Sequence, residues 1–173
     1  NLLPGVAEAT TRDRVGHGTA VAMVAAGVPH QSPIGIVSGA APKAYLGSYK
    51  IFGGPDDTST SDILIRALDD AVNDGMDVIN LSAGFTPVPR PEDDPIVRAV
   101  DRAVALGVIV VQSAGNLGPE PASTSSPGQS ETVLLAGAQP NGRVLMATVT
   151  VGDEMIVPAL AATIRPPEPL TGT

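Results

Sequence analysis

Short apolar runs alternate with amphipathic helical segments along the middle of the chain, and this order restricts the fold more than any other feature. The apolar runs are residues 77–84, 108–116 and 132–138. Between them, residues 62–74 and 95–106 carry apolar side chains three and four positions apart, the spacing of one helical face. This order predicts a parallel sheet, and strands that are apolar on both faces predict helices on both sides of it. We therefore expect an α/β fold with a three-layer, doubly wound, mostly parallel sheet.

The residues before this middle part predict further elements. The apolar stretch 17–26 predicts a buried helix, and residues 28–42 are expected to form a loop. Residues 44–51 alternate weakly in polarity, which favours another strand.

The end of the chain follows a different pattern. Residues 142–162 alternate in polarity on both sides of Gly152 and Asp153, which predicts a C-terminal β-hairpin with a tight turn. Pro-rich residues follow it. We expect an incomplete α/β domain over residues 1–140, and the hairpin with its tail over residues 141–173.

Composition excludes several functional classes. The formal net charge of −8 argues against nucleic-acid binding, because a phosphate backbone requires clusters of Lys and Arg. The absence of Cys excludes disulfides and thiolate metal sites. No apolar run in the sequence reaches the length of a membrane-spanning helix, so no membrane partner is expected.

Two of the predicted strands end in small and polar residues. "NLSAG" (80–84) closes the first run and "SAGN" (113–116) closes the second. Parallel strands bring their carboxyl ends to one edge of a sheet, where ligands of open α/β folds bind. The sequence therefore predicts a binding site at this edge.

Five segments resemble the subtilisin-like serine proteases, or subtilases. They are "GHGTAVAMVAAG", "GAAPKAYLGSYKIF", "AVNDGMDVINLSAGF", "GVIVVQSAGNLGP" and "SSPGQSETVLLAGA", and they occur in the order of that family between residues 16 and 138. Five motifs in order, each on the expected strand or helix, are far more specific than one alone. The resemblance implies a serine endopeptidase that acts on peptide or protein substrates.

His17 is the first candidate catalytic residue. In subtilases, a histidine at the start of a buried helix is the general base toward a serine and later the general acid toward the leaving amine. Gly16 and Gly18 leave space for substrate beside the ring, and Thr19 is expected to satisfy backbone groups at the helix start. The alternative is a histidine that only caps the helix.

Asn116 is the second candidate. The resemblance implies that its amide donates a hydrogen bond to the oxyanion of the tetrahedral intermediate. The alternative is an Asn that only stabilises a turn together with Gly118.

The resemblance also implies two walls of a substrate cleft. The first would pair its backbone with an extended peptide, and the second would face it across the primary specificity pocket. Small residues on both walls predict an open slot for a large apolar side chain, whereas the alternative is close packing of strand ends against helices. The first wall consists of Ser82, Ala83 and Gly84, the second of Ser113, Ala114 and Gly115, and residues 126–128 resemble the base of the pocket.

Two parts of the family's catalytic triad have no counterpart in the sequence. The residues before His17 contain no strand with an aspartate of the "DTG" type, and we interpret Asp13 as a solvated loop charge. No "GTSMA"-like serine motif follows. We therefore expect a fragment of a larger protease, cut before a protease-associated insert and inactive by itself.

Further expectations concern partners, cofactors and location. Apolar faces left bare in such a fragment predict that it either forms a homodimer or needs its missing parts. The chemistry requires no cofactor, and no acidic loop has convincing calcium-ligand spacing, "PDDTSTSD" (55–62) being the best candidate. The family habit implies a secreted, bacterial protein. Two alternatives stay open: a catalytically dead, subtilase-like peptide-binding module, and an unrelated flavodoxin-type domain.

Overall fold

A computed structural model gives the fold of this chain. Its described residues fall into two compact units, one that ends at Gly137 and one that starts at Ala138. The structure describes residue 10, residues 12–33, 35–52, 58–86 and 88–139, and the backbone of 146–151 and 155–160.

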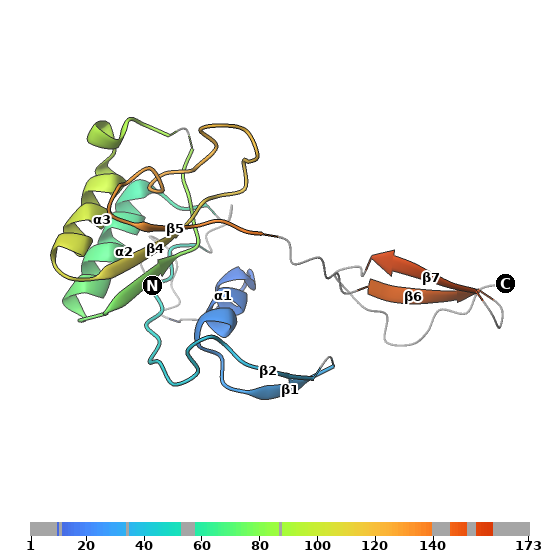
Figure 1. The fold of residues 1–173 in the computed structure, drawn as a ribbon. Coiled ribbons are helices and arrows are strands. Elements are labelled where there is room, and N and C mark those ends of the chain that lie inside the picture. The colour runs from blue at the N-terminus through green and yellow to red at the C-terminus, as the bar shows by residue number, and fades with distance from the viewer. Residues whose placement is uncertain are drawn as a thin grey trace. The chain divides into compact units, whose positions relative to one another are not determined.

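Two helices pack against each other in the first unit. Helix α2 spans Ser61–Asn73 and α3 spans Pro95–Ala105, after a short 3-10 turn η1, Pro91–Asp93. The two helices lie side by side in Figure 1. Both match the predicted helices to within one residue at each end. Their apolar positions recur on one face, and that face is buried in each helix.

The sheet of this unit is parallel, as the sequence predicted. Strands β3 (Val78–Leu81), β4 (Ile109–Ser113) and β5 (Leu134–Ala136) lie in this order. Val78 aligns with Ile109 in one pair, and Val111 aligns with Leu134 in the other. The strand ends are therefore in register, and the loops that follow them emerge at one edge.

The core lies between the sheet and the α2–α3 pair. Its buried residues come from both helices and from β3 and β4: Leu64, Leu68, Leu81, Ile96, Val100, Ala103 and Val110. On the opposite face Val78, Ile109 and Leu134 are each more than half exposed. Among the described helices, α2 and α3 cover one face of the sheet, and the second helical layer that the sequence predicts stays a prediction.

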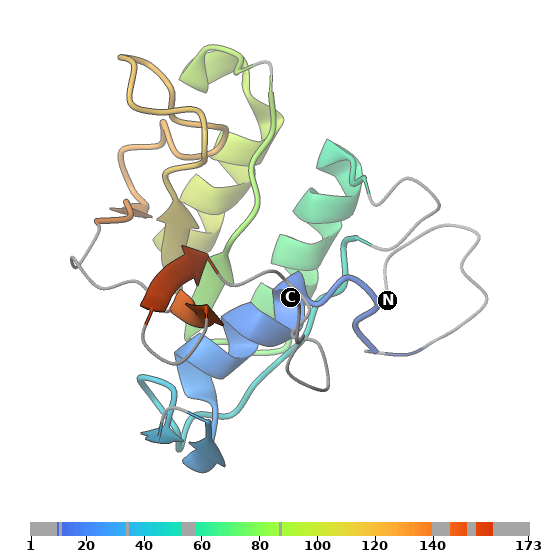
Figure 2. The ribbon, with the colours of Figure 1, turned by 90° about the vertical axis from the view of Figure 1, so that its right-hand side faces the viewer.

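Helix α1 spans His17–Ala26, as predicted, but it is not buried as predicted. Only Ala26 is buried, and Val24 is 74% exposed. Figure 1 shows α1 to one side of the packed pair α2 and α3, and in Figure 2 it lies below them. The loop around Gly39 holds the end of the helix, where its N–H donates to the Gly27 carbonyl at 2.8 Å. Apolar composition did not lead to burial because no other described helix or strand packs closely against this helix.

Two further expectations for the N-terminal part are wrong. The predicted loop 28–42 contains a small antiparallel pair, β1 (His30–Ser32) and β2 (Gly35–Val37). The predicted strand 44–51 is irregular instead, and Tyr45 is fully exposed. A strand requires a hydrogen-bonded neighbour, and none of the described residues pairs with this segment as one.

In the second unit, β6 (Met146–Val151) pairs antiparallel with β7 (Met155–Leu160). The predicted turn at Gly152 and Asp153 and the Pro-rich tail lie outside the described residues. Among the helices that the structure describes, none has the length and apolarity needed to cross a membrane.

Candidate active site

A hollow of about 230 Å³ lies where β3 and β4 end. It brings together the predicted walls and Asn116, with Ala114 as the one wall residue that does not line it. The lining residues are Ser82, Ala83, Gly84, Thr86, Ser113, Gly115, Asn116, Leu117 and Ser125. The parallel register explains this meeting, because it carries the ends of two strands to one edge.

The first wall directly follows β3. The Asn80 amide donates to the Ser82 hydroxyl at 2.9 Å, and the Gln112 amide donates to the Ala83 carbonyl at 2.8 Å. Gln112 itself is completely buried in β4, so it ties the first wall to the neighbouring strand. The backbones of Ser82 and Gly84 make no hydrogen bond to the described part of the chain. They are therefore free to pair with an extended peptide.

The second wall continues β4. The Ala114 N–H donates to the Ala136 carbonyl at 2.8 Å, which fixes this residue to β5 and explains why it does not line the hollow. Gly115 has a φ of +89°, a conformation that residues with a side chain rarely adopt. The chain turns here away from the sheet and presents Asn116 at the edge.

Ser125 forms the floor between the walls, and sequence reasoning did not assign it to the site. A side chain on Gly84 would collide with Ser125, and a Cβ on Gly115 would lie 2.8 Å from its hydroxyl oxygen. This hydroxyl is buried and has no hydrogen-bond partner in the described structure. The sequence signal for this floor is the pair of glycines, Gly84 and Gly115, which leave room for Ser125. The sequence does not show that Ser125 is the residue that fills this room.

The buried carboxylate of Asp94 holds the loop that carries Ser125. It accepts a hydrogen bond from the Ser126 hydroxyl at 2.5 Å, from the Gln129 amide at 3.0 Å and from the Ile96 N–H at 2.9 Å. Ser126 also exchanges two backbone hydrogen bonds with Phe85, directly after the first wall. The predicted base of the pocket, residues 126–128, is buried and does not line the hollow.

Asn116 lies exposed at the mouth of the hollow. Its side chain makes no hydrogen bond to any residue that the structure describes. The expected alternative, an amide engaged in stabilising its own turn, therefore finds no supporting contact here. An amide with free N–H groups beside a substrate cleft can donate to an oxygen that becomes negatively charged.

His17 is the first residue of α1 and is exposed. Its ring makes no hydrogen bond within the described residues, and it does not line the hollow. The structure therefore groups Asn116 with the walls but does not bring His17 to them.

Asp13 is a loop charge, as interpreted from the sequence, but its carboxylate is also held by four hydrogen bonds from the chain. One carboxylate oxygen accepts from the N–H groups of Val15 and Gly16, each at 2.8 Å. The other accepts from the Thr19 N–H at 2.8 Å and the Thr19 hydroxyl at 2.7 Å. Hydrogen bonds from the backbone of Gly16 and Thr19 lead the causes that hold the pKa of Asp13 far below its usual range. The expected role of Thr19 is wrong, because its hydroxyl donates to Asp13 and does not accept from the backbone N–H groups at the helix start.

No cluster of three or more potential metal ligands occurs among the described His, Asp and Glu residues. Residues 55–57 of the candidate calcium loop lie outside the described part.

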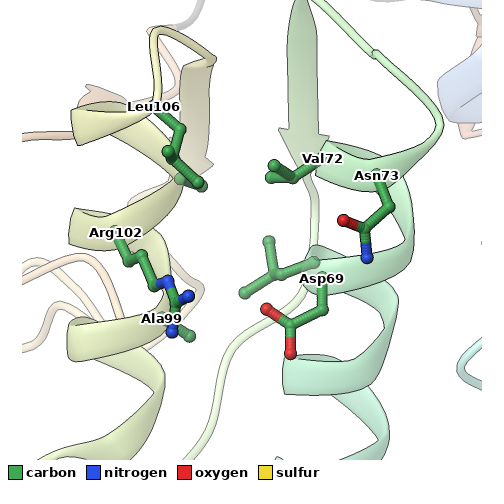
Figure 3. A pocket seen from close by; sticks show the side chains of 8 residues that line it. Asp69, Val72, Asn73, Ala99, Arg102 and Leu106 are labelled. Atoms are coloured by element: carbon green, nitrogen blue, oxygen red, sulfur yellow. The ribbon is translucent and has the colours of Figure 1, made fainter.

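A second hollow, of about 240 Å³, lies between α2 and α3 (Figure 3). Asp69 and Asn73 contribute to it from α2, and Arg102 and Leu106 from α3. It contains none of the predicted site residues and is formed by the two helices, not by the strand ends. We therefore assign the candidate site to the first hollow.

Comparison with known sequences gives the family. Residues 4–162 match the subtilase family. The subtilisin-like protease SBT2.1 of Arabidopsis thaliana is 39% identical over 169 residues, which are 88% of this chain and 19% of that protein. SBT4.11 of the same plant is 36% identical over 148 residues, or 82% of this chain and 19% of the relative. The chain thus spans about a fifth of the length of these relatives.

Solved structures agree. The protease domain of PatA superposes with a TM-score of 0.61 at 29% identity, covering 78% of this chain and 47% of that one. A psychrophilic protease superposes with a TM-score of 0.56 at 30% identity. The match covers 85% of this chain and 44% of the chain of that protease. From the matched residues and these relatives, the chain belongs to the subtilases, the family of subtilisin-like serine proteases.

Proposed function

We propose that this chain supplies the general base, the oxyanion donor and the primary substrate cleft of a serine endopeptidase. The observation that carries the proposal is the hollow at the strand ends, which combines both predicted walls with the free amide of Asn116. A fold alone does not establish an activity. A cleft for a peptide beside a free amide donor, in contrast, is an arrangement that can support peptide hydrolysis.

The roles follow from the chemistry of acyl transfer. His17 takes the proton of a serine hydroxyl as the serine attacks the peptide carbonyl, and then returns the proton to the leaving amine. Asn116 donates to the oxygen that becomes negative in the intermediate. Ser82 and Gly84 pair with the substrate backbone, and the side chain before the cleaved bond enters the hollow above Ser125.

The proposal places the serine nucleophile, and the aspartate that orients His17, in the rest of a longer protein. The relatives are about five times as long as this chain, which supports this view. The chain by itself is then inactive, and peptide cleavage by the purified chain would contradict that part of the proposal. Secretion stays a prediction from the family.

The decisive experiment is fluorophosphonate labelling of the full-length protein. Labelling is expected in the wild type and is lost in His17→Ala, whereas His30→Ala, at the other histidine, keeps it. Asn116→Ala lowers kcat by on the order of 10²–10³, and the matched control Asn73→Ala on α2 does not. A folded wild-type protein that resists labelling would overturn the proposal and favour the peptide-binding module.

We further propose that the sheet face with Val78, Ile109 and Leu134 is covered in the complete protein by a second helical layer. In the isolated chain the same face is expected to drive self-association. Analytical ultracentrifugation of the chain tests this, with Ile109→Ser expected to shift it toward the monomer. A monomeric wild-type chain at tens of micromolar would contradict self-association.

A further inference from the structure

We infer that Asp13 is a positioning residue for His17, which it holds in place by closing the first turn of α1 from outside the helix. This inference rests on the proposed role of His17 as general base. Asp13 itself is not placed in contact with substrate.

The contacts of Asp13 surround His17 along the chain. Its carboxylate binds the N–H groups of Val15 and Gly16 before the histidine and both donors of Thr19 after it. The four donors are 2.7–2.8 Å from the two oxygens. The backbone on both sides of His17 is thus fixed to one rigid, planar group.

The start of α1 has no other side-chain cap in the described structure. Gly16 precedes the helix with a φ of +91° and offers no side chain. The Thr19 N–H is one of the donors that a helix leaves unpaired in its first turn, and Asp13 satisfies it. Without this carboxylate the first turn would fray, and His17 is its first residue.

Few other contacts hold the histidine. Its ring is exposed and makes no hydrogen bond within the described residues, and Ala26 at the far end is the only buried residue of α1. The position of the ring therefore follows from the backbone of the first turn. A general base displaced by about 1 Å can lose a factor on the order of 10² in rate.

The four donors around Asp13 favour the ionised form of its carboxylate. The hydrogen bonds from Gly16, Thr19 and Val15 hold the pKa of Asp13 well below its usual range. The four contacts are consequently charge-assisted, and they persist at every pH above the acid range.

The test compares three variants of the full-length protein. Asp13→Ala removes every contact, and Asp13→Asn keeps the shape but only one acceptor oxygen. Asp62→Ala is the matched control, since Asp62 lies in the first turn of α2, where a hydrogen bond with Thr60 lowers its pKa. We expect kcat to fall roughly 10–100-fold in Asp13→Ala with KM within about twofold, an intermediate kcat in Asp13→Asn, and no change in Asp62→Ala.

A second readout does not depend on activity. The ring order of His17, measured by NMR relaxation, should decrease in Asp13→Ala and stay unchanged in Asp62→Ala. If the wild type proves inert, the proposed function fails, and the ring order alone decides the inference. A kcat within twofold of the wild type, a loss confined to KM, or an unchanged ring order would each overturn it.

Discussion

The two halves of the proposed catalytic machinery are held in opposite ways. The half with Asn116 rests on buried polar groups, since Asp94 is 1% exposed and Gln112 is fully buried. The half with His17 rests on Asp13, a carboxylate near the surface, and on a helix with a single buried residue. Both halves come from the same chain, but only the half with Asn116 is anchored by fully buried side chains.

The cleft is therefore held rigidly, whereas the position of His17 depends on contacts close to it in the chain. The cleft is assembled once the sheet and the α2–α3 pair have folded, because its anchors are buried with them. The position of His17 depends on a local hydrogen-bond network at the start of α1. Variants in the two halves should therefore differ in the size and the kind of their effects.

The largest difference in the free energy of unfolding is expected between substitutions in the core and in α1. Leu64→Ala removes a buried side chain of α2 and should lower the free energy of unfolding by about 2–5 kcal/mol. Val24→Ala, on the exposed face of α1, should change it by less than about 0.5 kcal/mol. Urea unfolding of the chain measures both. Equal losses would show that α1 is packed as firmly as the core.

Removal of the buried anchor should have the next largest effect. Asp94→Ala leaves the donors of Ile96, Ser126 and Gln129 without a partner, so we expect a loss of about 2–4 kcal/mol in unfolding free energy. Asp93→Ala, at the exposed neighbour, serves as the control in the same urea titrations. If the two variants were equally stable, the carboxylate of Asp94 would not anchor the cleft.

A smaller effect is expected inside the cleft. Gly84→Ala pushes a methyl group against Ser125 and should cost about 1–3 kcal/mol of stability while narrowing the hollow. Ser125→Gly in the same chain should restore most of this loss, because the two sites are in contact. A double-mutant cycle in thermal unfolding measures the coupling. If the effects of the two substitutions on stability were additive, the added methyl group would not collide with Ser125.

The smallest effect is expected at the His17 end and depends on pH. The pKa of Asp13 is lowered by folding, so its stabilising contribution is present above the ordinary Asp value of about 3.9 and is lost as the pH falls through the folded-state pKa. We expect the first turn of α1 to lose helicity on acidification before α2 does, as followed by NMR chemical shifts. In Asp13→Asn that dependence should be much weaker, and an identical acid profile would argue against the network.

The sequence predicted the parts of the fold that depend on periodic patterns. Helices α2 and α3 followed from apolar spacing, and β3, β4 and β5 from short apolar runs. It also predicted that Ser82, Gly84, Gly115 and Asn116 lie at one edge, because parallel strands leave few alternatives.

Features that depend on partners were not predictable. The apolar stretch of α1 suggested burial, and the alternation in residues 44–51 suggested a paired strand. Neither composition nor periodicity indicates whether a neighbouring element is present to bury the one or pair with the other. The floor at Ser125 and the contacts of Asp13 join residues through loops with no regular spacing. Small polar residues in loops have many compatible partners, so sequence alone does not choose among them.

The three-way anchorage at Asp94 also has a kinetic consequence. The loop it holds contains the Gly128 N–H, bonded to the Ser125 carbonyl at 2.8 Å, and the Ser130 N–H, bonded to the Pro127 carbonyl at 3.0 Å. These amides should exchange with deuterium at rates close to those of the core, because opening the loop requires breaking a buried network. A peptide would then meet a floor at Ser125 that is already in place, and its association would proceed in one phase without a slow loop closure.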